Sequence, residues 1–76
     1  MFKVYGRAGC SACNQAVSLL SMKGEDHQYL SMGKDYDVQK FMSFNSSHKT
    51  FPLITQVVDG EEVYVGGLAE LKQKLK

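Results

Sequence analysis

The chain contains the stretch Phe2-Lys3-Val4-Tyr5-Gly6-Arg7-Ala8-Gly9-Cys10-Ser11-Ala12-Cys13, which passes from strand-like alternation into helical spacing. Both cysteines of the protein lie here, and a C-x-x-C pair at a strand-to-helix junction is typical of a thiol–disulfide redox site. Free amide N–H groups and the helix dipole at the helix start favour a thiolate at Cys10. Two Cα atoms three residues apart along a helix are roughly 5–6 Å apart, which suits a disulfide. The stretch therefore predicts an activated nucleophile and a partner thiol that resolves it.

The composition is that of one small globular domain spanning residues 1–76, with 43% hydrophobic and 22% charged residues. A net charge of +1 argues against a nucleic-acid-binding surface, which usually needs a strong basic excess. No apolar run is long enough for a membrane span or a signal peptide. Two cysteines are too few for the disulfide framework of a secreted domain. We therefore expect a cytoplasmic, monomeric protein that binds neither nucleic acid nor a membrane.

Helical spacing follows the cysteine motif and predicts one helix face turned toward a core. That face consists of Cys13, Ala16, Val17 and Leu20. Ser11 either caps this helix or lies in its first turn, and Gly24 is a typical terminator. A second strand is expected over His27–Met32.

A polar turn over residues 33–37 separates that strand from a second helix, expected from Asp37 to about Ser46. Its predicted buried face consists of Val38, Phe41 and Met42.

The second half of the chain predicts a β-hairpin and a last helix. Leu53–Val58 has strand composition, Asp59-Gly60 is a strong hairpin signal, and Val63–Val65 forms the return strand. Gly66-Gly67 interrupts the pattern before a lysine-rich helix over Leu68–Leu75. The order is β-α-β-α-β-β-α, in which the first β-α-β unit implies a parallel pair with a right-handed crossover. The fold class is therefore α/β, with a four-stranded mixed sheet and three flanking helices.

This order resembles a glutaredoxin of the thioredoxin superfamily, over nearly the whole chain. The resemblance rests on the C-x-x-C motif after the first strand, Thr50-Phe51-Pro52 before the third, and Gly66-Gly67 after the fourth. The short length and the Met1–Gly6 segment are also similar to small bacteriophage glutaredoxins, which implies a location in the host cytoplasm. Thioredoxin is less similar, because the chain has no tryptophan and no Gly-Pro between its cysteines.

The resemblance implies roles for individual residues. Cys10 would be the exposed nucleophile and Cys13 the buried resolving thiol. Pro52 would be cis and face the disulfide, which leaves the backbone of Phe51 free to pair with an extended substrate. Glutathione carboxylates would meet Arg7 and the start of the last helix. The implied glutathione- and substrate-binding residues are Arg7, Ser11, Ala12, Thr50, Phe51, Pro52, Gly66, Gly67, Leu68 and Ala69.

Two positions depart from the family pattern. Ala69 stands where the family often has an aspartate that binds the glutathione ammonium group, with Glu70 beside it as a substitute. Ala12 stands where an aromatic side chain usually shapes the glutathione groove. These departures leave the electron donor open between glutathione and thioredoxin reductase.

The sequence therefore predicts a dithiol glutaredoxin without a bound cofactor, with glutathione as electron donor and a disulfide-containing client protein. Ribonucleotide reductase is a client that the resemblance implies. The alternative is a non-catalytic binding module that uses Phe51 and the sheet edge. No metal site is expected, since tetrahedral zinc needs four ligands and only His27 and His48 accompany the cysteines. An iron–sulfur cluster shared between two copies, known in the family, is a further alternative.

Overall fold

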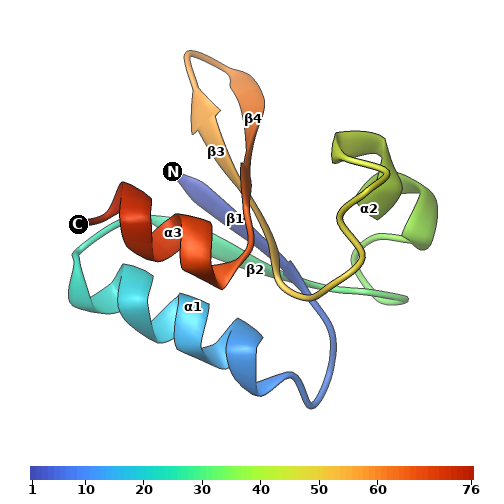
Figure 1. Ribbon diagram of the computed structural model, residues 1–76, viewed down its shortest axis with the longest axis horizontal. Coiled ribbons are helices and arrows are strands. Elements are labelled where there is room, and N and C mark those ends of the chain that lie inside the picture. Colours follow the sequence, from blue (N-terminus) through green and yellow to red (C-terminus); the bar gives the residue numbers. More distant parts are fainter.

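The computed structural model describes all 76 residues and contains four strands and three helices in the expected order (Figure 1). They are β1 (Phe2–Gly6), α1 (Ser11–Met22), β2 (His27–Ser31), α2 (Val38–Phe44), β3 (Leu53–Val58), β4 (Glu61–Gly66) and α3 (Leu68–Lys74). The expected α2 continued to about Ser46, whereas the helix ends at Phe44. None of the three helices is both long and apolar enough to cross a bilayer.

The four strands form one mixed sheet in the order β2-β1-β3-β4. The β1–β2 pair is parallel and connected through α1, while β1–β3 and β3–β4 are antiparallel. Asp59 and Gly60 join β3 to β4 with positive φ angles of 52° and 82°, as a two-residue hairpin turn requires. The predicted four-stranded mixed sheet and its hairpin are thus confirmed.

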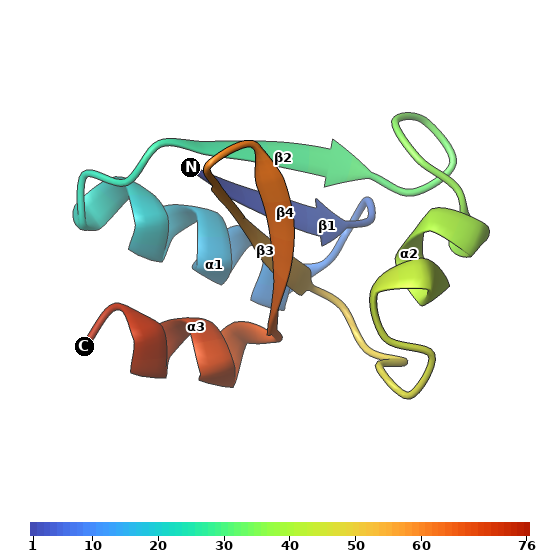
Figure 2. The ribbon, with the colours of Figure 1, turned by 90° about the horizontal axis from the view of Figure 1, so that it is seen from above.

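The main core lies between the sheet and the pair α1 and α3, which lie side by side over one face (Figure 2). Alternation along the strands turns every second side chain toward these helices. The buried members of this core are Phe2, Val4, Ala16, Leu20, Ile54 and Leu71. Cys13, Ala16 and Leu20 are buried as expected, and Val17 on the same face is partly buried.

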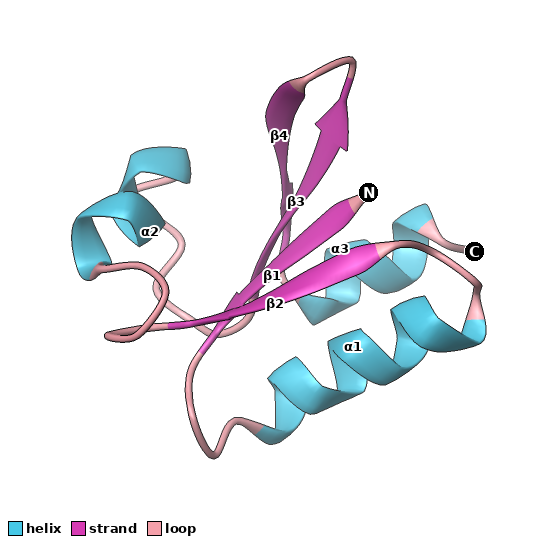
Figure 3. Cartoon of the chain, turned by 180° about the vertical axis from the view of Figure 1, so that it is seen from behind, coloured by secondary structure: helices cyan, strands magenta, loops and turns pink.

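The opposite face of the sheet is covered by α2 only at the end where β1 and β2 finish (Figure 3). Tyr5, Phe41 and Leu53 form a second buried cluster there. The expectation that Val38 and Met42 are also buried is wrong, because these side chains are 54% and 45% exposed. The spacing marks an apolar face of α2 correctly, but the sheet reaches only its Phe41 side.

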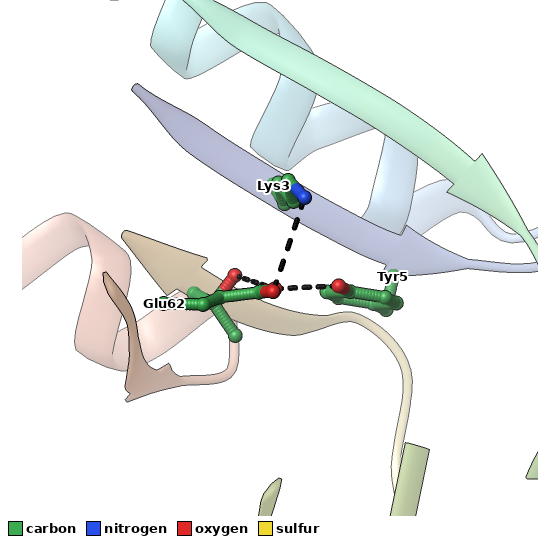
Figure 4. Close-up of polar contacts among 4 residues, drawn as sticks. Lys3, Tyr5 and Glu62 are labelled. Atoms are coloured by element: carbon green, nitrogen blue, oxygen red, sulfur yellow. Dashed lines mark hydrogen bonds and ion pairs between the residues drawn. The ribbon is translucent and has the colours of Figure 1, made fainter. Parts of the chain in front are cut away.

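The rest of this second face carries a polar network around the Glu62 carboxylate, which accepts hydrogen bonds from Thr55, at 2.6 Å, and from Tyr5. The Lys3 ammonium group lies 3.9 Å from the same carboxylate (Figure 4). Burial by itself raises the pKa of the Glu62 carboxyl. The two hydrogen bonds and the charges of Lys3 and Lys40 outweigh burial, so the pKa lies below its ordinary value.

Candidate functional site

Cys10 and Cys13 form a disulfide at the start of α1, with their Cα atoms 5.3 Å apart. Cys10 is the N-cap residue, and its sulfur accepts a hydrogen bond from the Cys13 amide at 3.2 Å. Ser11 is therefore the first helical residue rather than the cap. Cys13 is fully buried, whereas Cys10 is partly exposed. Only the Cys10 sulfur is open to an incoming reactant, and the helix start directs an N–H group at it.

The last residue of β1 lies directly against the buried sulfur. A Cβ atom on Gly6 would stand 2.8 Å from the Cys13 sulfur, closer than real Cβ contacts, and 3.0 Å from the Tyr29 hydroxyl, which is a tight contact. Only glycine therefore allows β1 to approach the disulfide this closely.

Two tyrosine hydroxyls hold the loop between β1 and the disulfide. Tyr29, on β2, donates a hydrogen bond to the carbonyl oxygen of Arg7, and Tyr36 donates one to that of Gly6, both at 2.8 Å. Burial, followed by the influence of Tyr29, raises the pKa of Tyr36 to about 12. Neither tyrosine was predicted to belong to the site, because nothing in the local pattern pairs a tyrosine with a carbonyl more than twenty positions away.

The turn before β3 contacts Arg7, which lies three residues before Cys10. The Phe51–Pro52 peptide bond is cis, as expected, and Pro52 is buried. The Arg7 guanidinium carbon lies 5.4 Å from the centre of the Phe51 ring, a cation–π contact. The backbone N–H and C=O of Phe51 make no hydrogen bond within the chain. They remain free to pair with an extended partner.

His48 is half-buried and bonds to this turn. Its Nε2 lies 3.2 Å from the Pro52 carbonyl oxygen, and its Nδ1 lies 2.6 Å from the Tyr64 hydroxyl. Because a carbonyl oxygen only accepts, Nε2 carries the proton in this contact. In the neutral ring, Tyr64 then donates to Nδ1. His48 therefore joins the proline turn to β4.

Gly66 and Gly67 lie beside this turn, and the Glu70 side chain occupies the space next to them. A Cβ atom on Gly66, whose φ is 137°, would stand 2.6 Å from Cγ of Glu70. The Gly67 amide donates a hydrogen bond to the Glu70 carboxylate at 2.7 Å. The Glu70 side chain thus contacts both glycines, for which the resemblance implies a role in binding glutathione.

The structure brings several of the predicted residues together and leaves others at the surface. Arg7 meets Phe51, and a Cβ atom on Gly67 would lie 3.5 Å from the Pro52 carbonyl oxygen. Three of the predicted binding residues are exposed, namely Ser11, Thr50 and Ala69. Two others, Ala12 and Leu68, are partly buried. No three His, Cys, Asp or Glu side chains are grouped as a metal site would require.

Comparison with solved structures finds proteins with a similar fold. Glutaredoxin 1 from Francisella tularensis, crystallised with cacodylate, superposes with a TM-score of 0.68 at 26% sequence identity, covering 96% of this chain and 88% of that one. The protein is glutaredoxin-like. A glutathione S-transferase from Xanthobacter autotrophicus Py2 superposes with a TM-score of 0.72 at 20% identity, covering 99% of this chain but only 36% of that one.

The similarity to the transferase shows only that the two proteins share a fold. No protein-family model and no curated protein sequence matches this glutaredoxin-like protein. Its disulfide at the N-terminus of α1 and its glutaredoxin neighbour together support a thiol–disulfide oxidoreductase.

Proposed function

We propose that this protein is a dithiol glutaredoxin that reduces protein disulfides and glutathione mixed disulfides, with glutathione as its electron donor. The observation that carries the proposal is the Cys10–Cys13 pair itself, with one accessible sulfur at the helix start and one enclosed behind it. Following the resemblance, ribonucleotide reductase is a proposed client and the cytoplasm is the proposed compartment.

The reductive half of the cycle uses the two sulfurs in turn. The Cys10 thiolate attacks one sulfur of the client disulfide, forms a mixed disulfide and releases the first client thiolate. The Cys13 thiolate then attacks the Cys10 sulfur, which expels the second client thiolate as the Cys10–Cys13 bond forms. Two electrons have passed to the client, and the enzyme is left in the disulfide form described above.

The regenerating half consumes two glutathione molecules. The first glutathione thiolate attacks the Cys10 sulfur, forms a mixed disulfide and releases Cys13, which takes up a proton. The second attacks the glutathione sulfur of that mixed disulfide, which frees Cys10 and yields glutathione disulfide. Arg7, exposed beside Phe51, is proposed to attract a glutathione carboxylate, and the free Phe51 backbone is proposed to pair with the peptide.

A second electron donor is favoured by the Glu70 contact. The Glu70 carboxylate accepts a hydrogen bond from the Gly67 amide and so puts negative charge where the resemblance implies a glutathione carboxylate. Together with Ala12 and Ala69, this contact supports thioredoxin reductase as an alternative reductant.

The test is the reduction of hydroxyethyl disulfide with NADPH and either glutathione plus glutathione reductase or thioredoxin reductase alone. We expect turnover with glutathione, none with Cys10→Ser, and retained monothiol turnover with Cys13→Ser. Turnover only with thioredoxin reductase would support the alternative donor. Absence of turnover with both donors would favour the non-catalytic binding module and overturn the proposal.

A further inference from the structure

An apolar groove lies between α2 and the loop that leads to the proline turn. It encloses a volume of about 410 Å³. Its walls include Val38, Phe41 and Met42 from α2, Met32 from the preceding turn, and Phe51 from the loop. The exposed side chains of Val38 and Met42, which a closed helix face would have buried, thus form one side of this groove.

A single residue, Phe51, connects the groove to Arg7 in the loop that precedes Cys10. The Phe51 ring forms part of the groove wall, and the Arg7 guanidinium lies over that ring. The backbone N–H and C=O of Phe51 are free. An extended segment that pairs with the Phe51 backbone therefore has to pass beside the groove.

The charged side chains around the groove are all positive. Lys49 is the charged residue of its lining, His48 lines it as well, and Arg7 stands beside it on Phe51. No acidic residue lines it. The acidic residues Asp35 and Asp37 line a separate hollow instead. The groove accordingly suits an apolar side chain with a carboxylate nearby.

From this arrangement we infer that the groove is the docking site for an extended segment of the client protein, with a large apolar side chain two residues from the client cysteine and an acidic residue next to that side chain. The inference rests on the proposed redox function. In an extended chain, side chains two residues apart point to the same side and are about 6.5 to 7 Å apart. When the client cysteine faces Cys10, its second neighbour therefore faces the same surface of the enzyme. The unbranched side chains of Met32 and Met42 can adapt to different apolar groups.

The test uses short peptides with one cysteine activated as a mixed disulfide with thionitrobenzoate. Cys10 of the pre-reduced protein attacks the peptide sulfur and releases coloured thionitrobenzoate, so a single turnover gives the second-order rate constant. We expect leucine at one of the two positions two residues from the cysteine to raise this rate constant about tenfold over alanine, because a buried leucine side chain contributes on that scale. Leucine directly next to the cysteine should change it less than twofold.

Two charge changes in the groove and one matched control locate the effect. Met42→Asp should abolish the leucine preference, and Lys49→Glu should turn a preference for a neighbouring aspartate into one for lysine. Met22→Asp makes the same change at a side chain that is 82% exposed and outside the groove, so it should leave the preference intact.

Activated mercaptoethanol serves as a small substrate that cannot reach the groove. Two results would overturn the docking inference but leave the redox function standing, provided that all variants attack this small substrate at the wild-type rate. One is that the wild-type protein shows no leucine preference, and the other is that Met22→Asp loses the preference as fully as Met42→Asp. If the wild-type protein does not attack even the small substrate, the redox function itself fails.

Discussion

The hydroxyl group of Tyr36 donates a hydrogen bond to the carbonyl oxygen of Gly6, 2.8 Å away, and so joins the turn before α2 to the last residue of β1. The same carbonyl oxygen accepts the Met32 amide at 2.9 Å. Because burial raises the pKa of Tyr36 to about 12, this hydroxyl keeps its proton and remains a donor throughout the neutral range. The approach to the disulfide is thus fixed by a side chain from outside the C-x-x-C motif.

Tyr36→Phe keeps the ring and removes this hydrogen bond. We expect the free energy of unfolding to fall by about 1 kcal/mol, because the Gly6 carbonyl retains its bond from Met32. Reduction of hydroxyethyl disulfide should slow a few-fold, since the loop that precedes Cys10 loses an anchor. Urea denaturation and steady-state kinetics check the two effects. A variant equal to the wild type in both would show that the contact does not hold the loop.

Gly6→Ala places a methyl group against the Cys13 sulfur. We expect a destabilisation of about 1 to 3 kcal/mol, because the Cys13 sulfur and the Tyr29 ring would both have to move aside. The double variant Gly6→Ala with Cys13→Ala serves as control, since the smaller side chain removes the sulfur. It should be destabilised by less than the sum of the two single changes. Simple additivity of the two changes would mean that another contact causes the loss.

The Cys10 sulfur in the reduced protein should react with iodoacetamide as a thiolate at unusually low pH. As the N-cap of α1 it receives an amide hydrogen bond and the positive end of the helix dipole. We expect the alkylation rate to be half-maximal well below pH 8.5, which is about the ordinary value for a free cysteine. The Cys13→Ser variant makes Cys10 the single reporter. A midpoint near that of the same variant unfolded in urea would contradict the expectation.

Glu62→Gln should destabilise the protein at neutral pH by about 1 to 2 kcal/mol, because two hydrogen bonds to a charged acceptor are weakened. The pKa of Glu62 is lower in the folded chain than its ordinary value of 4.5, so the unfolded chain binds a proton more readily. The stabilisation is therefore fully present above about pH 4.5 and is lost as the pH falls through the lower, folded-state pKa.

Urea unfolding at neutral and at acidic pH measures this difference between the wild type and Glu62→Gln. The gap between the two proteins should close in acid. Glu61→Gln is the matched control, because Glu61 is exposed and makes no hydrogen bond through its side chain. Equal effects of the two substitutions would rule out the network as the cause.

The order and the approximate bounds of the strands and helices can be predicted from the sequence. Alternation, helical spacing and the Asp59-Gly60 turn are local signals, and the strands and helices follow them to within about two residues. The cysteine pair was predicted for the same reason, since its strand-to-helix setting is local. The exposure of Val38 and Met42 was not predictable, because spacing identifies an apolar face but not whether another element covers it.

The contacts that complete the site depend on residues far apart in the chain. Tyr29, Tyr36 and His48 each bond to the backbone of a loop whose position only the folded sheet determines. Glu70 was recognised as a neighbour of the ligand region, but its turn back onto Gly67 depends on the start of α3. Glu70 makes the returning half of a capping box, but Gly67 has no side chain for the other half, so the usual sequence signature is absent.

The six buried side chains of the main core come from β1, α1, β3 and α3, and none comes from α2. The scaffold that holds the two sulfurs can therefore persist while α2 changes its surface. Under the docking inference, substitutions on α2 change which client segments bind and leave the two sulfurs in place. New clients are then acquired by varying one short helix.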